Sequence, residues 1–135
     1  MRKILLLFFC FVIHSLTAQE VQEVYKFKEE NVKRKFLSGK TWNYLDLDSL
    51  TLLKNQNFHR VQFYRYHEIR YTEFKGTWKI ENDTLKLSSS EFNESQNKKD
   101  WIKQEGILKY KLRNIKLIPI NGYQFSAFKN LIRIE

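Results

Sequence analysis

The feature that most constrains the fold is a series of short runs of β-branched, aromatic and leucine residues that begins at Trp42. Clusters of Asn, Asp, Gly and Ser separate these runs, a pattern typical of consecutive strands joined by tight turns. The clearest hairpin spans residues 77–88 and turns at Glu81-Asn82-Asp83. The residues predicted on its core face are Trp78, Ile80, Leu85 and Leu87. Seven or eight such strands predict an all-β antiparallel meander, closed as a small barrel or strongly curved as a sheet.

Two segments have a different character. Residues 20–38 are highly charged with irregular apolar spacing, so we predict an N-terminal arm with a short helix near residues 29–37. Residues 88–105 are polar and rich in turn formers, and we expect a loop or a loop with a short helix there. Residues 39–135 are then expected to form one β domain, since no linker or low-complexity stretch divides them.

The N-terminus predicts export. Two basic residues precede the apolar run 4–13, and small residues follow it, so residues 1–19 are predicted to be a cleavable signal peptide. This run is shorter than the ~20 apolar residues that span a bilayer. Cys10, the only cysteine, lies inside the run rather than at a cleavage site, so we expect a periplasmic or secreted protein without a lipid anchor. The mature domain is then free of disulfides, which favours a bacterial envelope.

The chain is basic. Its formal net charge is +9, and loss of Arg2 and Lys3 with the signal peptide reduces this to +7. Basic proteins bind nucleic acid or anionic surfaces, and an exported protein rarely meets nucleic acid. An anionic envelope surface is therefore the partner that the charge predicts. The simpler interpretation, which we prefer, is a soluble protein with a positive surface and no such partner. The sequence does not indicate the oligomeric state.

Residues 58–71 interleave arginine and tyrosine. The residues predicted to form an interaction face are Arg60, Tyr64, Arg65, Tyr66, Arg70 and Tyr71. Such side chains can stack on sugar rings or bases, or hold anionic groups. The alternative, which we favour, is a pair of antiparallel strands whose outer faces carry cross-strand Tyr–Arg pairs.

No arrangement typical of an active site stands out. Asp46 and Asp48 can in principle act in acid–base chemistry or hold a hard cation, but we favour a solvated turn. His59 and His67 would lie about 26 Å apart on one strand, and no third ligand is indicated, so no metal site is expected. The serines at 88–90 have no catalytic context, and no phosphate-binding glycine loop exists. We therefore predict a protein that is not an enzyme and has no cofactor.

Within residues 39–88, a Leu-x-Leu segment, an Asn-rich turn and a Phe precede Gly-x-Trp, an Asn-Asp turn and a second Leu-x-Leu. The residues that carry this order are Leu50, Leu52, Asn55, Phe58, Gly76, Trp78, Asp83, Leu85 and Leu87. The order resembles that of small lipocalin-like proteins exported by Gram-negative bacteria. The resemblance implies a lipocalin-like barrel more than it implies an activity.

Two functional hypotheses follow. The first is a binding module that takes a small apolar or amphipathic ligand inside the barrel. The cavity for that ligand is predicted to be lined by Trp42, Phe63, Trp78 and Leu87. The second is a structural or interaction protein with a filled core, which works through the basic-aromatic outer face of residues 58–71.

Overall fold

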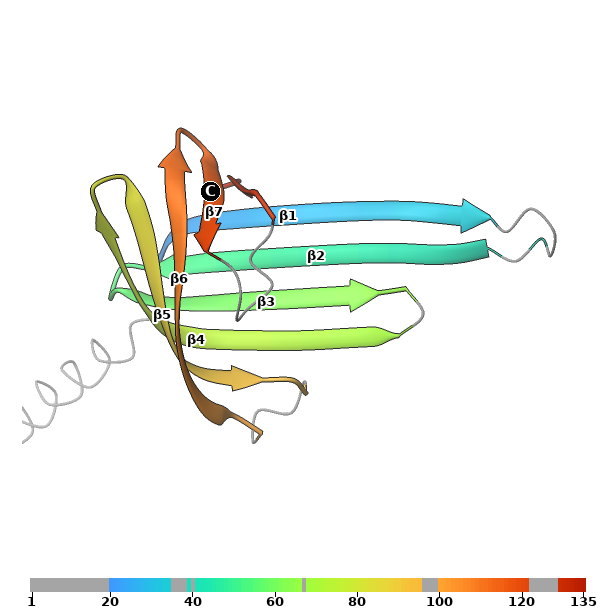
Figure 1. The fold of residues 1–135 in the computed structure, drawn as a ribbon, viewed down its shortest axis with the longest axis horizontal. Coiled ribbons are helices and arrows are strands. Elements are labelled where there is room, and N and C mark those ends of the chain that lie inside the picture. Colours follow the sequence, from blue (N-terminus) through green and yellow to red (C-terminus); the bar gives the residue numbers. More distant parts are fainter. Residues whose placement is uncertain (1–19, 35–38, 40, 67, 96–99, 122–128) are drawn as a thin grey trace, which may run out of the picture.

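The computed structural model describes residues 20–34, 39, 41–66, 68–95, 100–121 and 129–135. These residues form a closed antiparallel barrel of eight strands (Figure 1). The strands are β1 (Val21–Arg34), β2 (Thr41–Leu53), β3 (Asn57–Arg65), β4 (Ile69–Glu81), β5 (Thr84–Asn93), β6 (Ile102–Arg113), β7 (Lys116–Asn121) and β8 (Leu131–Arg133). Each strand pairs with the next along the chain, and β8 pairs with β1 to close the barrel. The predicted all-β class and meander topology are confirmed.

Tight turns connect the hairpins at the predicted polar clusters. Asn82 and Asp83 join β4 to β5 with φ angles of 48° and 59°, the left-handed pair that a two-residue hairpin turn requires. Asn114 joins β6 to β7 with a φ of 53°, and Gln56 has a φ of 63° between β2 and β3. Asn and Asp adopt this region more readily than most residues, so these turn residues set the strand boundaries.

The core is formed by inward-facing side chains from every strand. The core residues are Tyr25, Leu50, Leu52, Phe58, Phe74, Leu85, Leu87, Leu108, Tyr110, Leu117 and Leu131. Trp78 packs against them, and its indole Nε1 donates to the carbonyl oxygen of Leu53 at 3.0 Å. Ile80, predicted to be buried beside Trp78, is 48% exposed because it lies next to the β4–β5 turn. The hairpin therefore contributes three of its four large apolar residues to the core.

Two segments predicted to be irregular are strands. The prediction of a short helix near residues 29–37 is wrong for residues 29–34, because they belong to β1. Residues 35–37 lie outside the described residues. β1 pairs with β2 along its length and contributes Tyr25 and Phe27 to the core cluster, so a strand forms although its apolar residues are sparse. The loop expected over 88–105 is shorter, since β5 extends to Asn93 and β6 begins at Ile102. No helix within the described ranges is long and apolar enough to cross a membrane.

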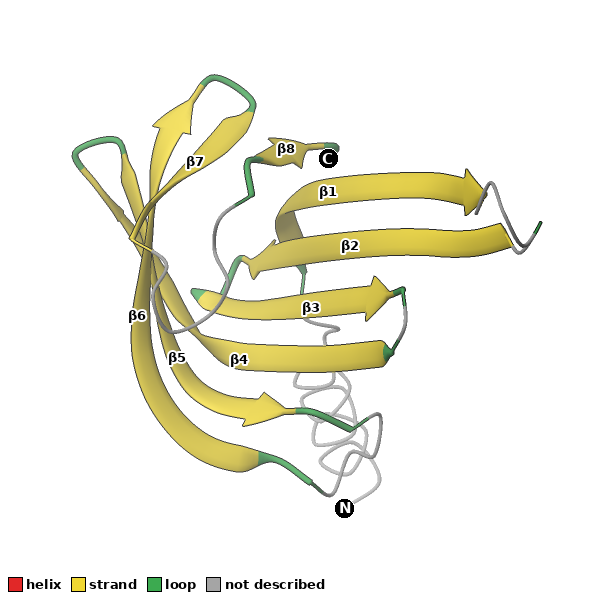
Figure 2. Cartoon of the chain, turned by 45° about the vertical axis from the view of Figure 1, so that its right-hand side comes forward, coloured by secondary structure: helices red, strands yellow, loops and turns green. Residues whose placement is uncertain are grey.

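The strands differ in length, and the molecule is elongated as a result. β1 and β2 remain paired as far as Arg34 and Thr41, whereas β2 and β3 separate after Leu45 and Arg65. The β1–β2 hairpin therefore projects beyond β3 and β4, and it points away from the β6–β7 hairpin (Figures 1 and 2). Toward the projecting end, the inward residues Tyr44, Gln62 and Tyr64 are half-buried rather than fully buried.

Candidate functional site

The inner face of β2 changes from apolar to acidic along the strand. Leu50 and Leu52 are in the core, and the preceding inward positions hold Asp46 and Asp48, which are also buried. Alternate residues of a strand share a face, so both carboxylates point into the barrel. The expectation that they lie in a solvated turn is wrong. Their even spacing, in phase with Leu50 and Leu52, is the sequence signal that indicates an interior position.

Arg60 of β3 forms a buried ion pair with Asp48. Its Nε donates to Oδ1 at 2.9 Å and its Nη2 donates to Oδ2 at 2.5 Å, while Gln62 Nε2 donates to Oδ2 at 3.0 Å. Burial lowers the pKa of Arg60, but the hydrogen bond and charge of Asp48 outweigh it, so the pKa is raised overall. Arg60 was predicted on an outer face. It lies inside because it alternates in phase with Phe58 and finds a carboxylate there.

Tyr110 of β6 lies beside this pair. The guanidinium carbon of Arg60 is 6.0 Å from the centroid of the Tyr110 ring. Burial raises the pKa of Tyr110 to about 12, so its hydroxyl is protonated at neutral pH. Neither this hydroxyl nor Nη1 of Arg60 has a hydrogen-bond partner among the described residues. Two polar groups that can donate a hydrogen bond are thus held inside the barrel.

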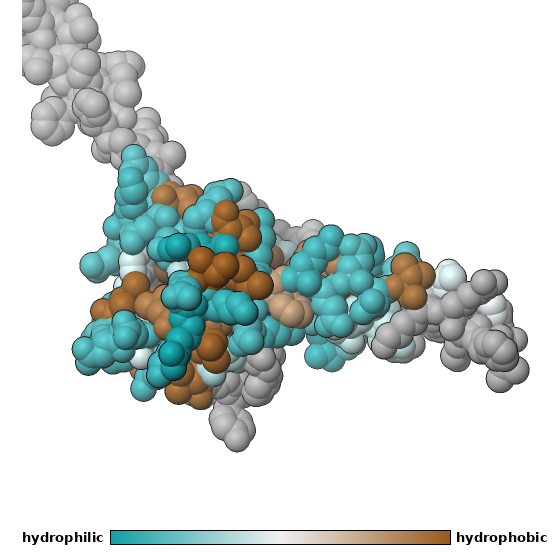
Figure 3. Space-filling view, turned by 90° about the horizontal axis from the view of Figure 1, so that it is seen from above, coloured by the Kyte–Doolittle hydropathy of each residue, from teal (hydrophilic) through white to brown (hydrophobic). Residues whose placement is uncertain are grey.

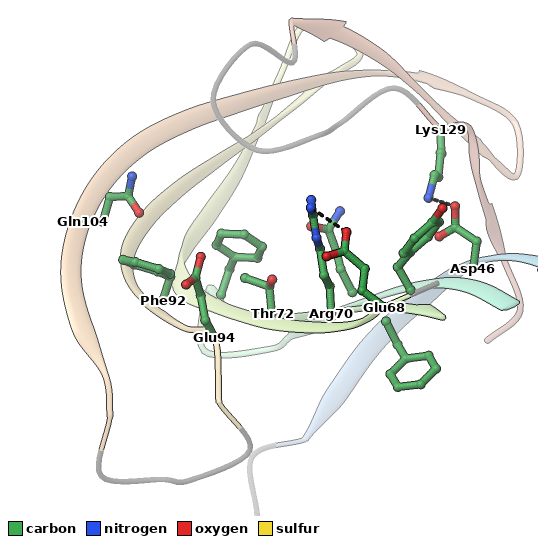
Figure 4. Close-up of a pocket in the computed structure, with 12 residues that line it drawn as sticks. Asp46, Glu68, Arg70, Thr72, Phe92, Glu94, Gln104 and Lys129 are labelled. Carbon is green, nitrogen blue, oxygen red and sulfur yellow. Dashed lines mark hydrogen bonds and ion pairs between the residues drawn. The ribbon is translucent and has the colours of Figure 1, made fainter. Parts of the chain in front are cut away.

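A cleft of about 680 Å³ lies between the β2–β4 wall and the β5–β6 wall. Its charged residues are Asp46, Glu68, Arg70, Glu94 and Lys129, and its aromatic residues are Phe63, Tyr64, Phe74 and Phe92. Figure 4 shows Thr72 and Arg70 on one wall of the cleft and Phe92 beside Glu94. Gln104 lies across the cleft from Arg70. Gln62 also lines the cleft and so connects it to the Asp48–Arg60 pair. The cleft therefore offers rings, hydrogen-bonding groups and charges of both signs.

Asp46 organises one end of the cleft. Lys129 and the hydroxyl of Tyr44, the latter at 3.2 Å, both donate to its Oδ2. The Tyr44 ring meets Tyr64 and Tyr66 edge to face, with centroid distances of 5.7 Å and 6.1 Å. Burial and the nearby Asp46 carboxylate raise the pKa of Tyr44 to about 12. Tyr64 and Tyr66, predicted on an outer face, instead pack around Tyr44 at the end of the cleft.

The rest of the predicted basic-aromatic face is divided between the two sides of the sheet. Arg70 lines the cleft and pairs with Glu68 at 2.6 Å. Tyr71 is the next residue along β4, so it points to the opposite side, where its hydroxyl donates to Glu73. Arg65 is half-buried at the end of β3. Strand alternation therefore prevents the stretch from forming one continuous face.

A second groove, of about 820 Å³, is lined by outward-facing residues of β3 and β4. His59 Nε2 lies 2.7 Å from Glu73 Oε2, and Lys75 Nζ lies 3.7 Å from the ring centroid of Trp101. Within the described ranges, no group of three His, Cys, Asp or Glu residues is placed to hold a metal ion. His67 lies outside the described residues. His59 and Glu73 are therefore paired with each other in this groove.

Of the described residues predicted to line a cavity, Phe63 borders the cleft, but it lies between the inward-facing Gln62 and Tyr64 and pairs with Tyr71, so its ring points to the other side of the sheet. Trp78 and Leu87 are cross-strand partners that pack in the core, because the barrel is filled at the level of the β4–β5 hairpin. The side chain of Trp42 lies outside the described part of the structure. The cleft is instead formed by the parts of β2, β3 and β4 that lie away from the β4–β5 turn, together with β5 and β6. Comparisons of the chain with protein-family models, curated proteins and solved structures gave no significant match.

Proposed function

We propose that the protein is an exported, non-catalytic binding module that holds a small amphipathic molecule in the cleft of its barrel. The cleft of about 680 Å³ carries this proposal, because small-molecule sites are concave, of this size, and combine aromatic rings with placed polar groups. The filled-core hypothesis accounts for the region around Trp78 and Leu87. It does not account for the half-buried inner face that holds Gln62, Thr72 and Phe92.

The lining favours an amphipathic ligand over a wholly apolar one. An apolar molecule would remove Glu68, Arg70 and Glu94 from water without replacing their hydrogen bonds to water, which is unfavourable. A molecule with both a ring or chain and polar substituents can pack on Phe74 and Phe92 while it hydrogen-bonds to the charged rim. Charges of both signs are present, so the polar part is more suitably neutral or zwitterionic than strongly charged.

The cellular setting is part of the same proposal. The basic, apolar and small-residue segments of residues 1–19 support export to the periplasm or medium of a bacterium. The Gly76–Trp78 motif and the eight-stranded barrel support a relationship to the exported lipocalin-like proteins of Gram-negative bacteria. A binding module in that compartment needs no cofactor and no nucleic-acid partner.

A fluorescence titration tests the proposal. We expect the neutral amphipathic dye 6-propionyl-2-(dimethylamino)naphthalene to bind the wild type, and Thr72→Trp to weaken this binding by about tenfold or more because the indole fills the cleft. Lys79→Trp is the matched control, since it adds the same ring at an exposed position of the same strand. Equal dye affinity for the wild type and Thr72→Trp would place the dye elsewhere and contradict the proposal.

A further inference from the structure

The β6–β7 hairpin has an outer face that the proposed function does not use. Leu112 pairs with Leu117 and packs toward the core, so the neighbouring positions on both strands point outward. Lys111 pairs with Ile118, and Arg113 pairs with Lys116, on that outer side. The residues of this basic isoleucine face are Ile107, Lys111, Arg113, Lys116, Ile118 and Ile120. None of them lines the cleft.

The isoleucines of this face are well exposed. Ile107 and Ile120 are each 55% exposed, and Ile118 is 38% exposed. Ile132 of β8, which pairs with Lys116, continues the aliphatic surface across the next strand and is also exposed. Figure 3, a view from above, shows hydrophobic areas interleaved with hydrophilic ones over the barrel. Grouped exposed aliphatic residues of this kind mark an interaction surface.

The charges of the face are of one sign. Residues 107–120 include four basic residues and no acidic residue. Lys111, Arg113 and Lys116 form no salt bridge with any residue that the structure describes. The nearby Glu81 of β4 is already paired with Lys79 and Lys86. The face is therefore available to a partner that carries negative charge.

We propose that the basic isoleucine face docks on the surface of a bilayer rich in anionic phospholipid. Basic side chains near such a surface are attracted to the headgroup phosphates, and aliphatic side chains gain by entering the boundary between headgroups and acyl chains. A second copy fits poorly, because two such faces would bring like charges together. Nucleic acid fits poorly as well, because its phosphates offer the isoleucines no apolar environment and the face has no aromatic ring for stacking.

Vesicle co-sedimentation tests this proposal. At low salt, the wild type is expected to bind phosphatidylglycerol–phosphatidylcholine vesicles and to leave pure phosphatidylcholine vesicles largely unbound. Lys111→Glu/Lys116→Glu is expected to weaken binding by about thirtyfold or more, because each cation near the membrane contributes about one kcal/mol. Ile118→Ser/Ile120→Ser keeps the charge and is expected to weaken binding by about tenfold, most visibly at high salt where screening removes the electrostatic part.

The matched control is Lys75→Glu/Lys103→Glu, which makes the same change in net charge at exposed positions of β4 and β6 outside the face. Its affinity for the anionic vesicles is expected to be within about twofold of the wild-type affinity, because the changed residues do not lie on the face that contacts the membrane. Circular dichroism establishes that each variant is folded. Equal losses in the control and in Lys111→Glu/Lys116→Glu would overturn the proposal, as would tighter binding to a short DNA duplex or self-association that the same variant abolishes. Thr72→Trp should sediment with vesicles like the wild type, because the cleft is a separate site.

Discussion

Gly76→Ala is expected to destabilise the barrel by about 4 kcal/mol or more, the largest effect of any substitution that we predict. A β-carbon at this position would lie 1.9 Å from the carbonyl oxygen of Ser88 and 2.8 Å from the Phe58 ring. The carbonyl belongs to the backbone of the neighbouring strand, so a rotamer change cannot relieve the clash. Small domains are stable by only about 5–15 kcal/mol, and urea denaturation followed by tryptophan fluorescence should show the loss directly.

The control for this substitution is Gly39→Ala. Gly39 has a φ of +64°, but no atom of the described residues lies within 4 Å of the position that its β-carbon would take. Alanine there costs only the strain of the left-handed conformation, about 1–2 kcal/mol. If both variants lost a similar amount of stability, the close contact between β4 and β5 at Gly76 would not be real.

Asp48→Asn is expected to cost about 3–5 kcal/mol, because it leaves the guanidinium of Arg60 buried without a counter-charge. The two side chains are at most 1% exposed and share two hydrogen bonds, so water cannot replace the lost carboxylate. The measurement is the free energy of unfolding in urea at neutral pH, where the wild-type ion pair is intact. The variant should also bind the dye less well if the Gln62 side of the cleft depends on Asp48 for its position.

Two further variants isolate the buried charge as the cause. Asp48→Leu combined with Arg60→Met should recover most of the lost stability, since replacing both members of a buried ion pair by apolar groups is often neutral or stabilising. Glu30→Gln breaks the exposed pair with Lys28 and should leave the free energy of unfolding close to that of the wild type, because water solvates both groups. A double variant as unstable as Asp48→Asn would contradict the account, because its loss could not then come from an unpaired charge.

The sequence predicts the parts of the fold that depend on local signals. These signals are the turn residues and the alternation of apolar and polar residues along a strand. Asn82-Asp83 and Asn114 prefer the left-handed conformation, and the apolar residues on either side alternate, so the β4–β5 and β6–β7 hairpins can be read directly. β1 could not be read in this way. Its strand is stabilised by pairing with β2 rather than by its own apolar pattern, and single-sequence propensity does not contain that pairing.

The candidate site is harder to predict for a related reason. Strand alternation inside a barrel is normally recognised by apolar residues, and here the alternating positions of β2 and β3 become polar at Asp48 and Arg60. A polar residue in phase with a core leucine looks like a surface or turn residue unless its partner on the next strand is known. Arg60 and Asp48 lie twelve residues apart in sequence, so only the register of β2 against β3 shows that they meet.

Native mass spectrometry of the protein isolated from a bacterial host tests the central claim, that the cleft of the barrel holds a small molecule. The wild type is expected to carry one small molecule per chain, either retained from the host or added as the neutral naphthalene dye, and to release it on denaturation. Thr72→Trp is expected to give only the polypeptide mass under the same conditions. A wild type that carries neither a host molecule nor the dye, or an identical adduct on both proteins, would contradict the account.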